Sequence, residues 1–149
     1  MVSVVLFGSV SRDTGAMEPA AAKADRVVLL DPVTGSEGDA SARQTLYTSL
    51  ARHLKAQGFT VTSSGSPRFR VRPSLVRLDV VRKGGAVEVA VKTSIAVVDN
   101  GRLDTGFERL ASIRSENPKA GSTRLAKTAL DAAASALAKD VAGRIAEKK

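Results

Sequence analysis

The stretch Phe69–Arg114, FRVRPSLVRLDVVRKGGAVEVAVKTSIAVVDNGRLDTGFERLASIR, decides the fold of this chain. Apolar and polar residues alternate along three of its segments, which is typical of strands that bury one face of a sheet. Gly84-Gly85 and Asn100-Gly101 separate the segments, and both pairs suit tight hairpin turns because they tolerate positive φ. The stretch therefore predicts a three-stranded antiparallel meander. Its inward-facing residues are expected to be Phe69, Val71, Val76, Leu78 and Val80, then Val87, Val89, Val91, Ile95 and Val97, then Leu103, Phe107, Ala111 and Ile113.

Four arginines lie along the first strand of the predicted meander. Alternation breaks at Pro73–Leu75 and resumes in the opposite parity, which is what a β-bulge produces, so all four guanidinium groups are expected on the polar face. One interpretation is an anion-binding or partner-binding stripe for a phosphate backbone or lipid headgroups. The other is a solvated edge strand whose charges and proline deter aggregation, and the scarcity of base-stacking aromatic residues favours it. The four residues are Arg68, Arg70, Arg72 and Arg77.

Three elements are expected ahead of the meander. Arg26–Leu30 is short and apolar after its first residue, which is typical of a strand buried on both faces. Ser41–Gln57 has leucines at helical spacing and predicts an amphipathic helix, which Gly58 can end in the left-handed conformation. Phe59–Thr62 predicts a short strand. Strand, helix and strand in this order favour a parallel pair joined by a right-handed crossover.

An alanine-rich helix is expected at Ser122–Ala146, lying across the sheet. The segment Val33–Ala40 contains glycines but lacks the Gly-Lys-Ser/Thr ending of a phosphate-binding loop, so it is expected to be a plain connection. Polar residues near each helix start suit N-caps. The candidate caps are Asp39 and Ser41 for the first helix, and Ser122 and Thr123 for the second.

The first ten residues are apolar and uncharged. They are too short to span a bilayer and lack the basic residues that open a secretory signal, so they predict a strand. The small, polar residues that follow suit a flexible arm. The strand can fold back onto its own sheet or complete the sheet of another copy, and both alternatives remain open. The candidate self-association residues are Val2, Val4, Val5, Leu6 and Phe7.

Together these patterns predict an α+β fold with a mixed sheet. The expected order is strand, loop, strand, helix, four strands and helix, with two helices packed on the three-stranded antiparallel meander. Residues 1–25 form an N-terminal strand and flexible arm, and residues 26–149 form a single α+β domain.

Charge and composition limit the possible chemistry. Basic and acidic residues balance up to Gly65, so the residues after it carry the whole formal net charge of +8, a field that favours nucleic acid, anionic lipid or acidic protein surfaces. Cysteine is absent, which excludes disulfides, thiol nucleophiles and thiolate metal sites. The single histidine, His53, adjoins the apolar stripe of the first helix and is expected to be a half-buried surface residue. We therefore expect no enzyme activity, no cofactor and no metal site.

Ile95–Leu103, with the text Asp-Asn-Gly-Arg between two strands, resembles a hairpin of a group of envelope-associated α/β modules. The leucine helix followed by Gly58–Val61 resembles the first crossover of the same group. This group includes the curli secretion channel, lipoprotein activators of penicillin-binding proteins and the N-terminal domain of the Tol translocation protein. The resemblance spans Arg26–Ile145, although the chain has no lipobox cysteine, so we expect no lipid anchor on the sequence as printed.

The resemblance implies a bacterial protein that binds proteins and catalyses no reaction of its own. It favours the periplasm or cell envelope, with the cytoplasm as the alternative, and it allows a homo-oligomer. The first hypothesis is therefore a protein–protein binding or assembly module that uses a sheet edge or a helix face. The alternative is a basic nucleic-acid-binding module that uses the arginine stripe. Salt dependence of DNA binding separates the two hypotheses.

Overall fold

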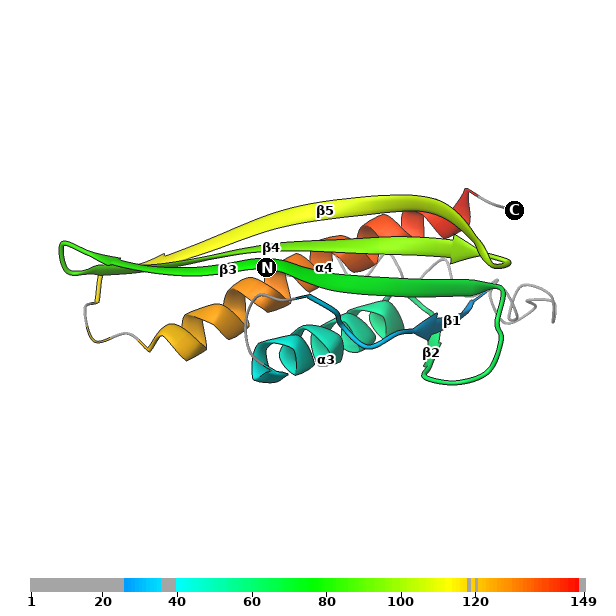
Figure 1. Ribbon diagram of the computed structural model, residues 1–149, viewed down its shortest axis with the longest axis horizontal. Coiled ribbons are helices and arrows are strands. Elements are labelled where there is room, and N and C mark those ends of the chain that lie inside the picture. Colours follow the sequence, from blue (N-terminus) through cyan, green and yellow to red (C-terminus); the bar gives the residue numbers. More distant parts are fainter. Residues whose placement is uncertain (1–25, 36–39, 118, 120, 148–149) are drawn as a thin grey trace, which may run out of the picture.

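Five strands form one mixed sheet, and two helices cover one of its faces (Figure 1). The computed structural model describes residues 26–35, 40–117, 119 and 121–147. The α+β fold with a three-stranded meander and two packed helices is confirmed, whereas the predicted strand around Val2–Phe7 and the candidate cap Asp39 lie outside the described residues. The elements are β1 (Val27–Leu30), α3 (Ala40–Ala56), β2 (Thr60–Thr62), β3 (Phe69–Lys83), β4 (Ala86–Asp99), β5 (Arg102–Ser115) and α4 (Ser122–Ala146).

The strands are arranged in the order β2-β1-β3-β4-β5. β1 runs parallel to both β2 and β3, as expected for a strand–helix–strand unit, and β3, β4 and β5 are antiparallel. The meander turns as predicted, because all four turn residues have the positive φ that a two-residue hairpin requires. Their φ values are 57° at Gly84, 83° at Gly85, 52° at Asn100 and 82° at Gly101.

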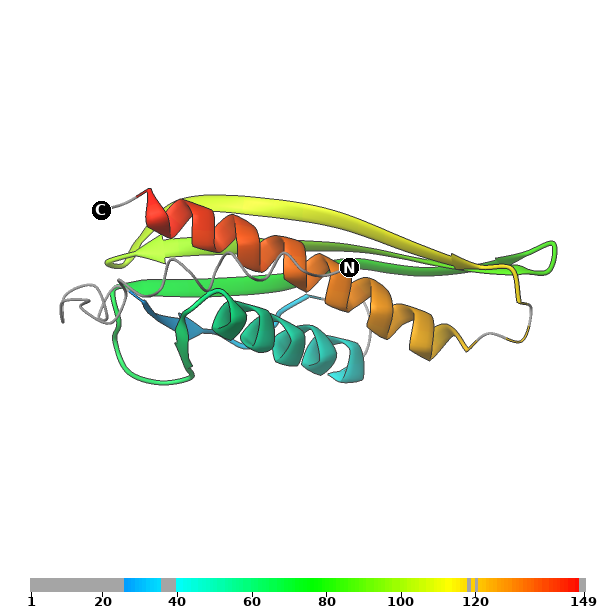
Figure 2. The same cartoon turned by 180° about the vertical axis from the view of Figure 1, so that it is seen from behind.

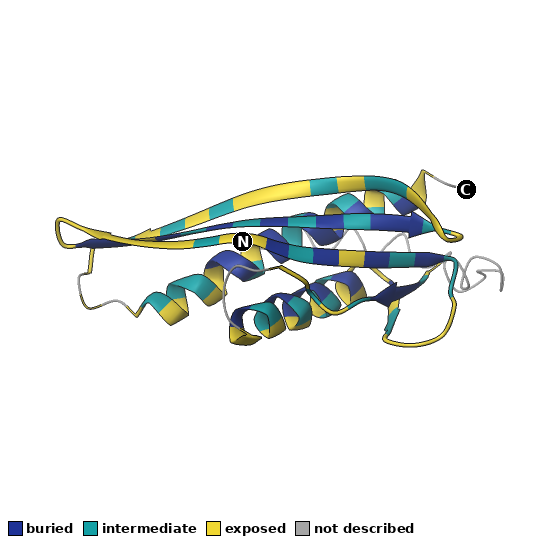
Figure 3. Cartoon of the chain, viewed as in Figure 1, coloured by how far each residue is buried: buried dark blue, intermediate teal, exposed yellow. Residues whose placement is uncertain are grey.

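The core lies between the sheet and the helices. α4 crosses β4 and β5 and also packs against α3, which the view from behind shows clearly (Figure 2). Alanines on the buried stripe of α4 allow this close approach, and Leu46, Leu50 and Leu54 of α3 are completely buried. Buried residues concentrate on β4 and on the inner sides of the helices, whereas the β3–β4 turn is exposed (Figure 3). On β4 the inward-facing residues are each at most 2% exposed: Val87, Val89, Val91, Thr93, Ile95 and Val97.

The predicted bulge in β3 is confirmed, but its position corrects one inward-facing assignment. The register with β4 shifts between Leu75 and Arg77, so Leu75 is still buried and Val76 is the extra residue. Val76 is therefore 41% exposed and does not face the core as predicted. Leu78 resumes the inward face opposite Val91.

Three other predictions were wrong for local reasons. Leu103 lies opposite Val98 on the uncovered face and is 72% exposed, because the β4–β5 register shifts beside it. The N-cap of α4 is Gly121, which makes no side-chain capping hydrogen bond, so neither Ser122 nor Thr123 caps the helix. Ser41 is likewise inside α3, one residue past its start at Ala40.

The connection after β1 continues alongside β3 instead of leaving the sheet. The Asp31 amide donates to the Val71 carbonyl at 2.9 Å, and the Leu75 amide donates to the Thr34 carbonyl at 2.8 Å. Gly35 has φ of 130°, and a Cβ there would lie 2.2 Å from the Leu75 carbonyl oxygen. Only glycine fits where the two backbones approach this closely, beside the bulge.

Candidate functional site

The face of the sheet opposite the helices carries the residues available to a partner. Outward-facing residues of β4 and β5 alternate with the buried ones, and most are small or polar. A bare face of this kind is common in antiparallel sheets and is the natural place for a binding surface. The outward-facing residues are Glu88, Ala90, Lys92, Ser94 and Ala96 on β4, with Val98 on the same face but only 6% exposed, and Leu103, Gly106, Glu108, Leu110, Ser112 and Arg114 on β5.

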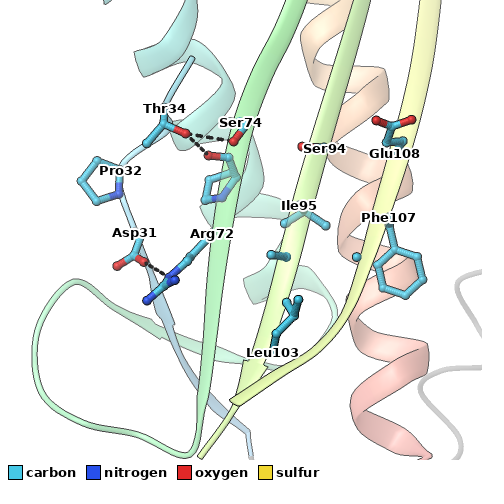
Figure 4. Close-up of a pocket in the computed structure, with 13 residues that line it drawn as sticks. Asp31, Pro32, Thr34, Arg72, Ser74, Ser94, Ile95, Leu103, Phe107 and Glu108 are labelled. Carbon is cyan, nitrogen blue, oxygen red and sulfur yellow. Dashed lines mark hydrogen bonds and ion pairs between the residues drawn. The ribbon is translucent and has the colours of Figure 1, made fainter. Parts of the chain in front are cut away.

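Small residues at the middle of this face open a shallow groove of about 790 Å³. Ser94, Ala96 and Gly106 lie at its floor, where larger side chains would fill the space. Asp31, Pro32 and Thr34 line one side, and Leu103, Phe107 and Glu108 line the other (Figure 4). The groove is thus partly apolar and partly polar, and it holds no cluster of groups suited to bond cleavage.

Local carboxylates pair with each of the four arginines proposed as an anion-binding stripe. Arg68 binds Asp99 through Nε at 2.8 Å, and its guanidinium also lies 4.7 Å from the centre of the Phe69 ring. Asp31 lies between Arg70 and Arg72, at 3.1 Å and 3.3 Å. Arg77 lies 3.5 Å from Asp79 on the same strand.

These ion pairs offset most of the positive charge of the stripe. Three carboxylates, those of Asp31, Asp79 and Asp99, accompany the four guanidinium groups. The pairs are also partly exposed, so each contributes little to stability, about 0–1 kcal/mol. A role for the stripe in binding an anion or a partner stays a prediction.

The edge strand β5 is a second exposed feature, which the sequence did not reveal. Within the part of the chain that the structure describes, it has a neighbouring strand on one side only, and it is 14 residues long. Leu103 and Leu110, which are 72% and 76% exposed, both project from its uncovered face. A long edge strand with exposed leucines is a template for pairing with another chain.

Ion pairs hold β5 to α4 on the covered side. Arg109 binds both carboxylate oxygens of Asp140, at 2.8 Å and 2.6 Å, and this hydrogen bonding raises the pKa of Arg109. Arg144 likewise binds both oxygens of Asp104, at 2.8 Å and 3.0 Å, and the hydrogen bonds from Arg144 to Asp104 raise the pKa of Arg144. The Asp104 side chain is only 9% exposed, so these contacts fix β5 firmly against the helix.

Four polar groups that the sequence did not bring together meet between α3 and α4. His53 Nε2 lies 3.0 Å from Asp131 Oδ1, and Arg52 also pairs with Asp131. Ser49 hydrogen bonds to the same carboxylate. Burial would raise the pKa of Asp131, but the hydrogen bond and charge of His53, with Arg52 and Ser49, bring that pKa below its ordinary value.

This arrangement resembles a serine–histidine–aspartate set only in composition. Ser49 is 7% exposed, and both Ser49 and His53 are directed at Asp131, so no hydroxyl is presented to a substrate. His53 is half-buried, with its side chain 24% exposed, as predicted. The three residues join the two helices and need no catalytic role to explain them.

Other kinds of site are not found in the described part of the chain. Residues 26–35, 40–117, 119 and 121–147 contain no group of three or more side chains able to hold a metal ion. Among these residues, no helix is both long enough and apolar enough to cross a membrane.

Three solved structures of bacterial proteins share this fold. Lipoprotein GNA1162 from Neisseria meningitidis is 14% identical, with a TM-score of 0.55 over 78% of this chain and 98% of that chain. A minor lipoprotein from Acinetobacter baumannii is 13% identical, with a TM-score of 0.56 over 80% of this chain and 92% of that one. The PelC dodecamer from Paraburkholderia phytofirmans is 17% identical, with a TM-score of 0.53 over 78% and 91%.

Sequence comparison adds no closer relationship. No protein-family model matches the chain, and no curated protein matches it. The likeness to the solved structures therefore concerns the fold, and it does not single out the curli, penicillin-binding-protein-activator or Tol group that the sequence resembles. The chain shares its fold with proteins named as bacterial lipoproteins and with PelC.

Proposed function

We propose that the chain is a non-enzymatic protein-binding and assembly module of a bacterial cell envelope, and that it associates with copies of itself. The observation that carries this proposal is the division of the sheet. One face is sealed by helices, while the other face and the β5 edge present apolar and polar groups with nothing over them in the described residues. Such surfaces suit proteins, because strand addition and groove filling both use them.

The solved structures with the same fold support the proposal of an envelope-associated, assembling protein. Two of them are named as lipoproteins, a class of envelope protein, and one is named as a dodecamer. Ion-paired arginines on the bare face fit a protein surface better than a phosphate backbone, because each guanidinium already has a carboxylate partner.

The apolar segment Val2–Phe7, which the sequence predicts to be a strand, supplies one route to assembly. It precedes β1 by some twenty residues, which at about 3.3 Å per extended residue is ample to reach a neighbouring copy. A strand donated in this way builds a dimer when two copies exchange strands, and a ring or an open fibre when the contact is head-to-tail.

Sedimentation velocity of the full chain over a wide concentration range tests the proposal. We expect the full chain to self-associate, and we expect deletion of Met1–Ala16 to reduce the size of the assemblies. An unchanged size after deletion would remove the role of the strand. A full chain that stays monomeric at every concentration would contradict self-association.

Nucleic-acid binding is tested in the same samples by anisotropy of labelled duplex and single-stranded DNA at increasing salt. We expect weak or absent binding. A steep loss of tight DNA binding with salt would instead support the arginine stripe as a phosphate-binding site.

A further inference from the structure

We propose that two copies of this chain join edge to edge through β5, which pairs antiparallel with β5 of the second copy about a two-fold axis at Ala111. This inference rests on the proposed self-association and names its surface and partner. The two sheets become one continuous sheet, with both helical layers on the same side.

The geometry of β5 suits such a pairing. From Thr105 to Ser115 its register with β4 is unbroken, because the irregularity lies ahead of it, near Leu103. No proline interrupts the strand. A regular edge of this length can form a full ladder with a copy of itself, whereas the other edge of the sheet is β2, with only three residues.

Charge favours this register over registers centred on residues 108 and 112. Pairing about Ala111 places Glu108 of each copy opposite Arg114 of the other, on the bare face, so two complementary pairs form. Both side chains are well exposed, at 61% and 60%, and their present partners are the exposed or partly exposed Lys92 and Glu116. A register centred on residue 108 or 112 instead places glutamates opposite one another, which is destabilising.

The same register protects the most exposed leucine. Leu110 lies opposite Ser112 of the second copy, so the two Leu110 side chains become diagonal neighbours across the axis. Each is 76% exposed in the single chain, and their contact removes apolar surface from water. Charge, leucine placement and ladder regularity therefore favour one arrangement.

The absence of cysteine allows a direct test in the full chain. In the paired strands, Ala111 faces its own counterpart with Cα atoms about 4.5–5.5 Å apart, which is within disulfide range. Ala111→Cys is therefore expected to form a covalent dimer on mild oxidation. Thr105→Cys is the matched control, because its two copies would lie roughly 40 Å apart along the ladder.

Charge reversal within the Ala111→Cys chain tests the register. Glu108→Arg alone and Arg114→Glu alone each place like charges opposite one another, and each is expected to reduce cross-linking about tenfold or more. A mixture of the two variants restores both complementary pairs, so it should give the heterodimer, identified by mass. Arg82→Glu, on the exposed β3–β4 hairpin, controls for the loss of positive charge in Arg114→Glu.

Each outcome bears on the inference. Cross-linking at Ala111→Cys that is no greater than at Thr105→Cys overturns the β5 contact, and so does cross-linking that ignores both charge reversals. If the full chain without these substitutions still assembles in sedimentation, the contact lies elsewhere and the proposed function survives. If that chain is monomeric throughout, the proposed self-association fails as well.

Discussion

The two faces of β4 differ although they share one backbone. The inward-facing residues from Val87 to Val97 are each at most 2% exposed. The outward-facing residues between them are small or polar and are half-buried or exposed. The inward face is β-branched and packs beneath α4, which is what a stable core needs. The outward face carries small and polar side chains, so it is less densely packed than the inward face. We infer that stability resides on one face and recognition on the other.

Neighbouring residues on the two faces provide the strongest test of this difference. Ile95→Ala removes a side chain that is 2% exposed, so we expect a loss of about 2–5 kcal/mol in the free energy of unfolding. Ser94→Ala, one residue away on the groove floor, should change it by less than about 0.5 kcal/mol. Urea unfolding followed by circular dichroism measures both. Equal losses would break the comparison.

The wall of the groove beside β1 provides a second test. Gly35→Ala forces a side chain onto positive φ and into the Leu75 carbonyl, so we expect about 1–3 kcal/mol of destabilisation. Gly65→Ala is the matched control, because Gly65 also has positive φ but no atom within 4 Å of a new Cβ. The excess loss at Gly35, measured by thermal unfolding, reports the close approach of the two backbones. No excess would mean that this wall can move away.

A polar contact on the covered side should matter least. Asp131→Asn weakens the contacts with His53 and Arg52, but Asp131 is 42% exposed, so we expect a loss below about 1 kcal/mol at neutral pH. The pKa of Asp131 is lower in the folded chain than in the unfolded chain, where it is about 4. The stabilisation that its charge contributes is therefore complete above the unfolded pKa and is lost as the pH falls through the folded pKa.

The variant and the parent chain should therefore converge in acid. Urea unfolding at neutral pH and at a pH below the folded pKa of Asp131 checks this expectation. A difference that persists at the lower pH would show that Asp131 acts through packing and not through its charge. Such a result would mean that the polar contacts on the covered side contribute more to the free energy of unfolding than we expect.

Local sequence signals were sufficient for most of the fold. Two residues at each hairpin tip specify the turns, and glycine before Ser122 with an alanine-rich stripe after it placed α4 at the observed bounds. The predictions that Val76 and Leu103 face the core were wrong because an extra residue in a strand moves the side chains beside it to the other face. Alternation with period two does not show which residue is the extra one.

The candidate surfaces depended on contacts between distant segments. Asp31 pairs with Arg70 and Arg72, about forty positions later in the chain, so an unopposed arginine stripe was the reasonable expectation from sequence. The groove requires Ala96 and Gly106 to be neighbours across two strands, and the open edge of β5 follows only from strand order. Register and topology, more than residue type, create these features.

The extra residue at Val76 has a consequence for variation among proteins of this fold. Past that point β3 pairs with β4 alone among the strands of the described residues, and Val81–Gly85 are all exposed before the chain returns. The β3–β4 hairpin can thus lengthen or shorten near its turn by pairs of residues without changing how the helices pack on the rest of the sheet. The distance that this hairpin extends from the core and the free energy of unfolding of the domain can then evolve separately.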